Sequence, residues 1–406
     1  MDVRRNVKVL SAGNTIVASV NSLWIMFMPY FFADMGLEAF QIGLIFTLFA
    51  IVRALASLAG GNASDKKGRK LIIGLGFAIY TSGPLIILGS LWFSSSSLLL
   101  MGMTAIAGYA WMMFGSGFGR PALSMLLIES SPEKQRGLSY MIATRFLPSI
   151  PPSILILVGT ALYGSNLFWL GLLLGFVGLL TVLLMYVTTL RETFSGREQD
   201  QLRSVTRARG MPYDWFLILF VLAFALDGIS SSGLSWYVPL FLGRSELDLY
   251  GLMISISTIV IALSALVSGG LVDRLGSAAA IAGGWTLLAL TVIVFPFASS
   301  PFEVIFLYSV WAGLDMVDIS VPPLVIADRY SKEKRTSILG AFNTTISLAS
   351  MVGPAIISFA LLLGDSVPFV VKALMNLGGV AIFILASKRF YSSADLQSNS
   401  DTKESW

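Results

Sequence analysis

The stretch Gly61–Lys70, GNASDKKGRK, is a short charged interruption between two long apolar runs. A degraded copy, GLVDRLGS, covers residues 270–277 and also lies between apolar runs. Asp65 and Asp273 are 208 residues apart, and so are the glycines three positions after them. A charged turn that recurs in this way predicts a chain built from two similar halves.

The composition indicates that both halves lie in a membrane. Hydrophobic residues make up 55% of the 406 residues and charged residues 12%, whereas ordinary soluble domains carry about 25% charged residues. The chain has no cysteine and no histidine, which excludes disulfides, thiolate metal sites and histidine catalysis. The basic N-terminus leads into an apolar run that continues to Met35 without a small-residue cleavage site. We therefore expect a first membrane helix there and not a cleaved signal peptide.

The apolar runs predict twelve membrane-spanning helices, since each span needs about 20 residues. The expected fold is an all-α integral membrane protein with two pseudo-symmetric six-helix bundles. The predicted spans are residues 9–33, 41–62, 71–93, 98–128, 138–163, 167–190, 215–242, 250–272, 277–298, 304–327, 337–361 and 367–387. The resulting domains are an N-terminal half (1–190), a polar cytoplasmic linker (191–214), a C-terminal half (215–387) and a cytoplasmic tail (388–406).

The distribution of basic residues predicts the orientation. With a cytoplasmic N-terminus, the inner loops and tails hold 22 of the 27 lysines and arginines, and the outer loops hold only Arg244. Cytoplasmic loops carry such an excess, so we expect both termini in the cytoplasm and a multi-pass protein of the plasma membrane. The net charge of +4 reflects this asymmetry, and no nucleic-acid-binding signature accompanies it.

The repeated turn resembles the signature of the major facilitator superfamily, G-x-x-x-D-[RK]-x-G-[RK]-[RK]. The first copy matches it completely, at Gly61, Asp65, Lys66, Gly68, Arg69 and Lys70. The second copy keeps Gly269, Asp273, Arg274 and Gly276, with Ser277 in place of a basic residue. The resemblance covers essentially the whole chain and implies a secondary transporter that works by alternating access.

The resemblance also implies a cytoplasmic latch. Asp65 would hold the outward-facing state together by contacting the start of the eleventh span. Glu129 and Arg136, which match Asp328 and Arg335 at an offset of 199 residues, would belong to the same charge network. The physics of the turn agrees, because glycines permit tight turns and a carboxylate stabilises a helix N-terminus. A plain positively charged loop would explain Lys66 and its basic neighbours, which face anionic lipid, but not the repeated aspartate.

Six charged residues are predicted near the membrane midplane, and they are Arg53, Arg120, Arg145, Asp227, Asp315 and Asp318. At 1.5 Å per helical residue they lie roughly 14–18 Å from the inner edge, near the middle of a hydrocarbon core about 30 Å thick. A charge at this depth costs about 2.5–3.5 kcal/mol on insertion scales and usually marks function. The arginines are all in the first half and the aspartates all in the second.

This separation of sign predicts a division of roles. Arg120 and Arg145 would bind an anionic solute, and Asp227, Asp315 or Asp318 would load protons. Asp315 and Asp318 are three residues apart, share a helix face and repel each other, which favours protonation of one of them. Asn21 and Asn343 add polar groups in the first and eleventh spans. The alternative reading is that these charges are permanent ion pairs between helices.

Three further residue patterns bear on structure. Lys372 lies near one end of the last predicted span, where we expect it to snorkel toward the membrane surface. The prolines in PSIPPS, residues 148–153, are expected to kink the fifth span. Pro354 is expected to bend the eleventh span in the same way.

The preferred function is proton-coupled transport of a small organic anion by a monomer in contact with membrane lipids. A proton-driven multidrug efflux antiporter and a lipid flippase on the same scaffold remain alternatives. The Gly-Pro-x-x-Gly-Gly pattern of drug-efflux members is absent from residues 138–164, which disfavours the antiporter. No nucleophile–base set, metal site or ATP-binding motif is found, so neither an enzyme nor a cofactor is predicted.

Overall fold

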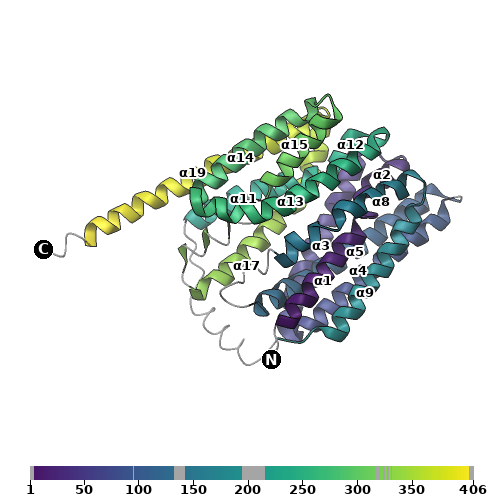
Figure 1. The fold of residues 1–406 in the computed structure, drawn as a ribbon, viewed down its shortest axis with the longest axis horizontal. Helices are drawn as coiled ribbons and strands as arrows, with labels where there is room; N and C mark the ends of the chain where they lie inside the picture. The colour runs from purple at the N-terminus through teal and green to yellow at the C-terminus, as the bar shows by residue number, and fades with distance from the viewer. Residues whose placement is uncertain are drawn as a thin grey trace.

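The computed structural model describes residues 4–94, 96–131, 142–193, 215–316, 321–322, 325–326, 329–330 and 332–401. Its helices run side by side along one direction, and both ends of the chain leave the bundle at the same end (Figure 1). We call this the terminal end. The opposite end, where α2 (Met28–Asp34) and α12 (Tyr237–Leu242) lie, is called the hairpin end.

The N-terminal half contains the elements α1 to α9. Its elements are α1 (Arg4–Asn21), η1 (Ile25–Phe27), α2, α3 (Ala39–Lys67), α4 (Arg69–Ser90), η2 (Leu91–Phe93), α5 (Leu98–Glu129), η4 (Ile142–Phe146), α7 (Leu147–Ser149), α8 (Pro152–Gly164) and α9 (Phe168–Thr189).

The C-terminal half repeats this pattern of long helices joined by short connections. Its elements are α11 (Trp215–Leu234), α12, η5 (Arg244–Glu246), α13 (Leu247–Leu275), α14 (Ser277–Val294), η6 (Phe295–Phe297), α15 (Pro301–Leu314), α17 (Lys332–Ala349), η7 (Ser350–Val352), α18 (Gly353–Leu361) and α19 (Val367–Asp401). The last helix continues well beyond the bundle (Figure 1, yellow).

The described residues bear out most of the predicted spans. They contain ten helices long and apolar enough to cross a membrane, and a bent pair, Ile142–Ser149 with Pro152–Gly164, makes an eleventh. The bend of 52° falls at the PSIPPS prolines, which confirms the predicted kink. The shorter apolar helix Pro301–Leu314 begins where the tenth span is predicted. The eleventh predicted span is interrupted by η7 directly before Pro354.

The duplicated turn has the same backbone in both halves. Gly68 ends α3 and begins α4 with a φ of 96°, and Gly276 separates α13 from α14 with a φ of 78°. Residues that have a Cβ atom rarely adopt such positive φ angles. The two glycines therefore permit the sharp reversals that the repeat predicts.

The two halves meet at the hairpin end. The Tyr30 hydroxyl donates to the Gly243 carbonyl at 3.3 Å, and the Tyr250 hydroxyl donates to the Met26 carbonyl at 3.4 Å. The ring of Phe46 stacks on Trp236 with centroids 6.1 Å apart. These contacts close the hairpin end between the halves.

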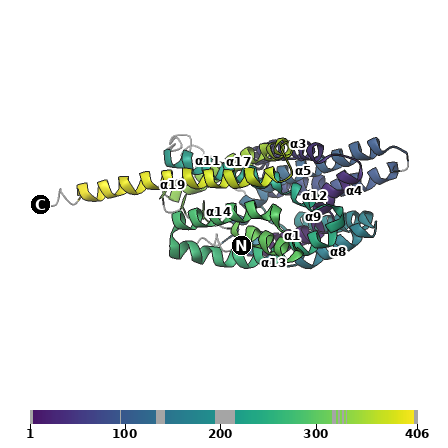
Figure 2. The same ribbon diagram turned by 90° about the horizontal axis from the view of Figure 1, so that it is seen from above.

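Two seams join the halves along their length. α13 packs beside α8 on one side of the molecule (Figure 2), and the Ser255 hydroxyl donates to the Ser153 carbonyl there. α18 packs against α3 on the other side. Toward the terminal end, Asn343, Thr344 and Thr345 of α17 are exposed.

Candidate functional site

Arg53 and Arg120 form a pair in the N-terminal half. A Cβ added to Gly117 would lie 2.1 Å from the Arg53 carbonyl oxygen, so the backbones of α3 and α5 touch at this point. Arg120 follows Gly117 by three residues and shares its helix face. The two guanidinium groups lie close enough to repel each other, and both side chains are exposed to solvent.

The described residues provide no carboxylate for this arginine pair. The ion pairs formed within 4.0 Å in the described part of the chain do not include Arg53 or Arg120. Tyr80 and Tyr109 are the neighbouring side chains that interact electrostatically with Arg53. Asn21 donates to the Tyr80 hydroxyl at 2.8 Å. The arrangement is a positively charged, accessible site with phenol groups at its edge.

Arg145 lies at the start of the bent fifth span. It is half-buried in η4, a single turn of π-helix at the start of the bent span. Its carbonyl accepts a hydrogen bond from the Ser149 hydroxyl at 2.7 Å. The structure thus brings two of the three predicted arginines together.

In the C-terminal half, two predicted aspartates share a lysine. The Lys372 ammonium donates to the Ser231 hydroxyl at 2.6 Å and lies 3.4 Å from Asp227 Oδ1. It also lies 4.0 Å from Asp315 Oδ1. We call Asp227, Asp315 and Lys372 the acidic cluster. Asp318 lies outside the described residues.

The expectation that Lys372 snorkels is wrong. Its side chain is completely buried, because α19 packs along α11 and turns this residue toward Asp227. Two carboxylates and a hydroxyl replace the water that a snorkelling lysine would reach. The cation of the acidic cluster therefore comes from the same half, and not from the arginines of the other half.

The predicted latch residues are placed in part. The Arg69 guanidinium lies 3.3 Å from Glu129 Oε1 and donates to the Ser64 hydroxyl at 2.9 Å. Lys66 and Arg274 are exposed. Gly61 lies in α3, and Asn343 is an exposed residue of α17. Arg136 lies outside the described residues. Asp65 lies in α3, and Gly269 and Asp273 lie in α13; the structure does not describe the side chains of the two aspartates.

Glu192 is a member of this network that the sequence did not point to. Its carboxylate accepts hydrogen bonds from the backbone N–H groups of Arg69 at 3.1 Å and Lys70 at 2.9 Å. These groups open α4, where the helix dipole favours a negative charge. The available signal was an acidic residue two positions beyond the sixth span, and it was hidden in a linker rich in charges of both signs.

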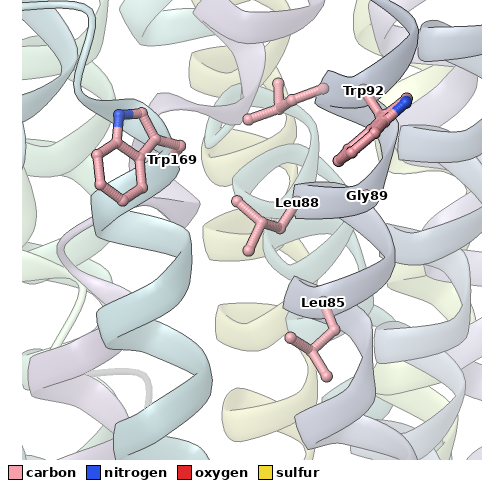
Figure 3. Close-up of a pocket in the computed structure, with 6 residues that line it drawn as sticks. Leu85, Leu88, Gly89, Trp92 and Trp169 are labelled. Carbon is pink, nitrogen blue, oxygen red and sulfur yellow. The ribbon is translucent and has the colours of Figure 1, made fainter.

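A hollow on the outside of the molecule is unrelated to these charges. Figure 3 shows it between α4 and α9, with Trp92 and Trp169 at its rim. It is lined by Leu85, Leu88, Gly89, Leu91, Trp92 and Trp169. Exposed tryptophans and leucines suit a membrane-facing surface near the lipid headgroups. The hollow has no charged lining residue that could bind an anion.

The fold and the duplicated turn indicate the class of protein. The family model described as Major Facilitator Superfamily matches residues 10–354 and 246–404 of this chain. The chain belongs to this superfamily of membrane transporters.

Individual relatives agree with this assignment. Multidrug resistance protein 2 of Bacillus subtilis is 24% identical over 405 residues, which cover 93% of this chain and 94% of that protein. Quinolone resistance protein NorA of Staphylococcus aureus is 27% identical over 113 residues, or 27% of its own length. The crystal structure of the human organic anion transporter TETRAN superposes with a TM-score of 0.66 at 17% identity, covering 94% of this chain and 100% of that one. That likeness shows the shared fold.

Proposed function

We propose that this transporter moves a small organic anion across the plasma membrane by alternating access and couples the movement to protons. The observation that carries the proposal is the arginine pair. Two adjacent guanidinium groups repel each other, and an opposite charge within about 4–6 Å stabilises the charged form of both. An anionic substrate would supply the charge that the described carboxylates do not.

Alternating access accounts for the way the halves meet. Contacts between the halves close the hairpin end, at Tyr30, Tyr250 and Trp236. The arginine pair stays accessible to solvent. The excess of basic residues in loops at the terminal end favours a cytoplasmic location for both termini, with twelve spans between them. In this orientation, the structure corresponds to a state that loads or releases substrate on the cytoplasmic side.

The acidic cluster supports the proton-coupling part of the proposal. Asp227 and Asp315 lie in a bundle interior, where ionisable residues commonly form proton relays. They lie in the other half from the arginine pair, so substrate and proton would bind on opposite sides of the boundary between repeats.

The test is a thermal-shift screen of purified protein against organic carboxylates, sulfonates and phosphates, with organic cations as comparison. We expect some anions to raise Tm for the wild type and for Arg5→Gln, an exposed control. The same anions should give a much smaller rise for Arg53→Gln and Arg120→Gln. Stabilisation by cations only, or full anion affinity in Arg120→Gln, would contradict the anion site.

A proton-driven multidrug efflux antiporter is the second candidate. It is favoured by the match to Multidrug resistance protein 2 over nearly the full length of both chains. Expression in a drug-sensitive bacterial strain tests it directly. Resistance to several unrelated cationic drugs, lost in Asp315→Asn, would favour this candidate over an organic anion carrier.

A further inference from the structure

Lys372 is a buried cation held between carboxylates from two other helices. It comes from α19, Asp227 comes from α11, and Asp315 immediately follows α15. The exposed fractions of the side chains are 0% for Lys372, 9% for Asp227 and 30% for Asp315. Burying a charge is costly unless it is paired and hydrogen-bonded, so each member of the acidic cluster depends on the others.

The acidic cluster has one carboxylate more than it has ammonium groups. If all three groups were ionised, the described residues of the cluster would carry one negative charge more than positive charge. The groups around the cluster are mostly neutral hydrogen-bonding partners. Ser231 lies against Asp227 and Lys372, and Ser230 bonds to the buried amide of Asn376. One further positive charge would make the cluster neutral, and a proton is the smallest that fits.

The two carboxylates are held very differently. Asp227 accepts hydrogen bonds from the Ser231 hydroxyl at 3.3 and 3.5 Å and from Lys372 at 3.4 Å. Trp311 hydrogen-bonds to the Asp315 carboxylate, but Asp315 Oδ1 is buried and has no hydrogen-bond partner. Asp315 also occupies the C-cap of α15, where the helix dipole disfavours negative charge. Asp227 is thus the carboxylate that stays ionised, and Asp315 is the one that takes a proton.

Among the described residues, the remaining titratable groups near Asp315 do not alter this balance; Asp318 is not among them. Tyr308, on its own helix, interacts with it electrostatically, and Trp311 places its ring 5.8 Å from the Lys372 ammonium. Of the helices packed on α15, α14 contains no titratable residue. On α13 such residues lie only near its ends, with Tyr250 beside Tyr308.

We propose that Lys372 is a tethered counter-cation that keeps Asp227 charged, so that the acidic cluster exchanges a single proton at Asp315. When Asp315 is protonated, the Lys372 ammonium is hydrogen-bonded to Asp227 and Ser231. When Asp315 releases its proton to water, the ammonium is shared between both carboxylates. The proton leaves the Asp315 carboxyl oxygen as hydronium and returns by the reverse step, without any other reactant. This proposal rests on the proton coupling of the proposed function and assigns its residues.

The test follows the protonated-carboxyl band by infrared difference spectroscopy during pH titration of the purified full-length protein in nanodiscs. The wild type should show one such band, and Asp315→Asn should lack it. Lys372→Gln should move the midpoint of the band by about 1–3 units to more alkaline pH, because an opposite charge is removed. Lys372→Arg should leave the midpoint near the wild-type value.

The double variant Asp227→Asn with Lys372→Gln is the control for misfolding of the single variant Lys372→Gln. It removes a matched pair of charges and should keep a single titrating band that belongs to Asp315. The proposal is overturned if Asp315→Asn keeps the band while Asp227→Asn loses it. It is also overturned if Lys372→Gln folds with an unchanged midpoint.

Transport measurements separate this proposal from the proposed function. Vesicle uptake of an anion from the thermal-shift screen is compared with and without a pH gradient. Uptake that ignores the gradient would contradict proton coupling, while the infrared result would still decide whether Lys372 controls the proton on Asp315.

Discussion

In the N-terminal half, two cations lie side by side without a described carboxylate, whereas in the C-terminal half two carboxylates share one buried cation. The arginine pair is accessible to solvent, and Lys372 is not. The first arrangement leaves its charge to be met by a ligand. The second meets most of its charge internally and leaves room for a proton. The repeated scaffold therefore carries two unlike sites, and substitutions that change the charge of each half should have unlike effects.

The largest expected effect comes from breaking the acidic cluster. Lys372→Met removes the cation from the buried Asp227 and the half-buried Asp315, and removing one partner of a buried ion pair typically costs about 3–5 kcal/mol. We expect a correspondingly large fall in the free energy of unfolding, measured by thermal or denaturant unfolding in detergent. The loss should shrink at acidic pH, because protonation removes the uncompensated charge.

The matched control for Lys372→Met adds Asp227→Asn to it. The double variant should recover most of the lost stability, because only one carboxylate then remains in the cluster. An unstable double variant would show that Lys372 contributes packing more than charge.

The next effect concerns the arginine pair. Arg120→Gln should weaken binding of an anion from the thermal-shift screen by about 1.5–3 kcal/mol, the usual value for a hydrogen bond to a charged group. The unfolding free energy should stay constant or rise, since the substitution relieves repulsion with Arg53. Titration calorimetry and thermal unfolding of the same preparation measure both quantities. A destabilised Arg120→Gln protein would indicate that the arginine has a structural partner.

The difference between the two sites also explains which of their features could be predicted from the sequence. The duplicated turn and the prolines act locally, so Gly68, Gly276 and the bent fifth span were predictable from spacing and backbone chemistry. The rise per helical residue predicts a membrane depth for Arg53 and Arg120, and that depth stays a prediction. Their adjacency could not be predicted, because it depends on Gly117 bringing α5 onto α3.

The C-terminal site shows where such interpretation fails. The position of Lys372 near a span end suggested snorkelling, but its environment is set by the face of α19 that packs on α11. A hydropathy profile does not show which face of α19 packs on α11. Glu192 was missed for a similar reason, because its role depends on the chain folding back onto the start of α4.

A smaller effect should come from the contact that positions the arginines. Gly117→Ala places a Cβ 2.1 Å from the Arg53 carbonyl oxygen, so α3 and α5 must separate. Overpacking of this kind costs about 1–3 kcal/mol. Anion affinity should fall as well, although no charge is changed. Gly283→Ala is the control, since nothing lies within 4 Å of its Cβ. Equal behaviour of the two variants would exclude Gly117 as a positioning residue.

The smallest expected effect tests the network around the duplicated turn, remote from both sites. Glu192→Gln keeps one of the two oxygens that accept hydrogen bonds from the backbone N–H groups of Arg69 and Lys70, and it removes the negative charge at the start of α4. Charge at a helix N-terminus contributes about 0.3–1 kcal/mol and is screened by salt. We expect a destabilisation of that size at low ionic strength that fades in high salt, measured by thermal unfolding. Anion affinity and the infrared band of Asp315 should not change, because the network lies at the terminal end. A change in anion affinity or in the infrared band would mean that the turn between α3 and α4 is coupled to the arginine pair or to the acidic cluster.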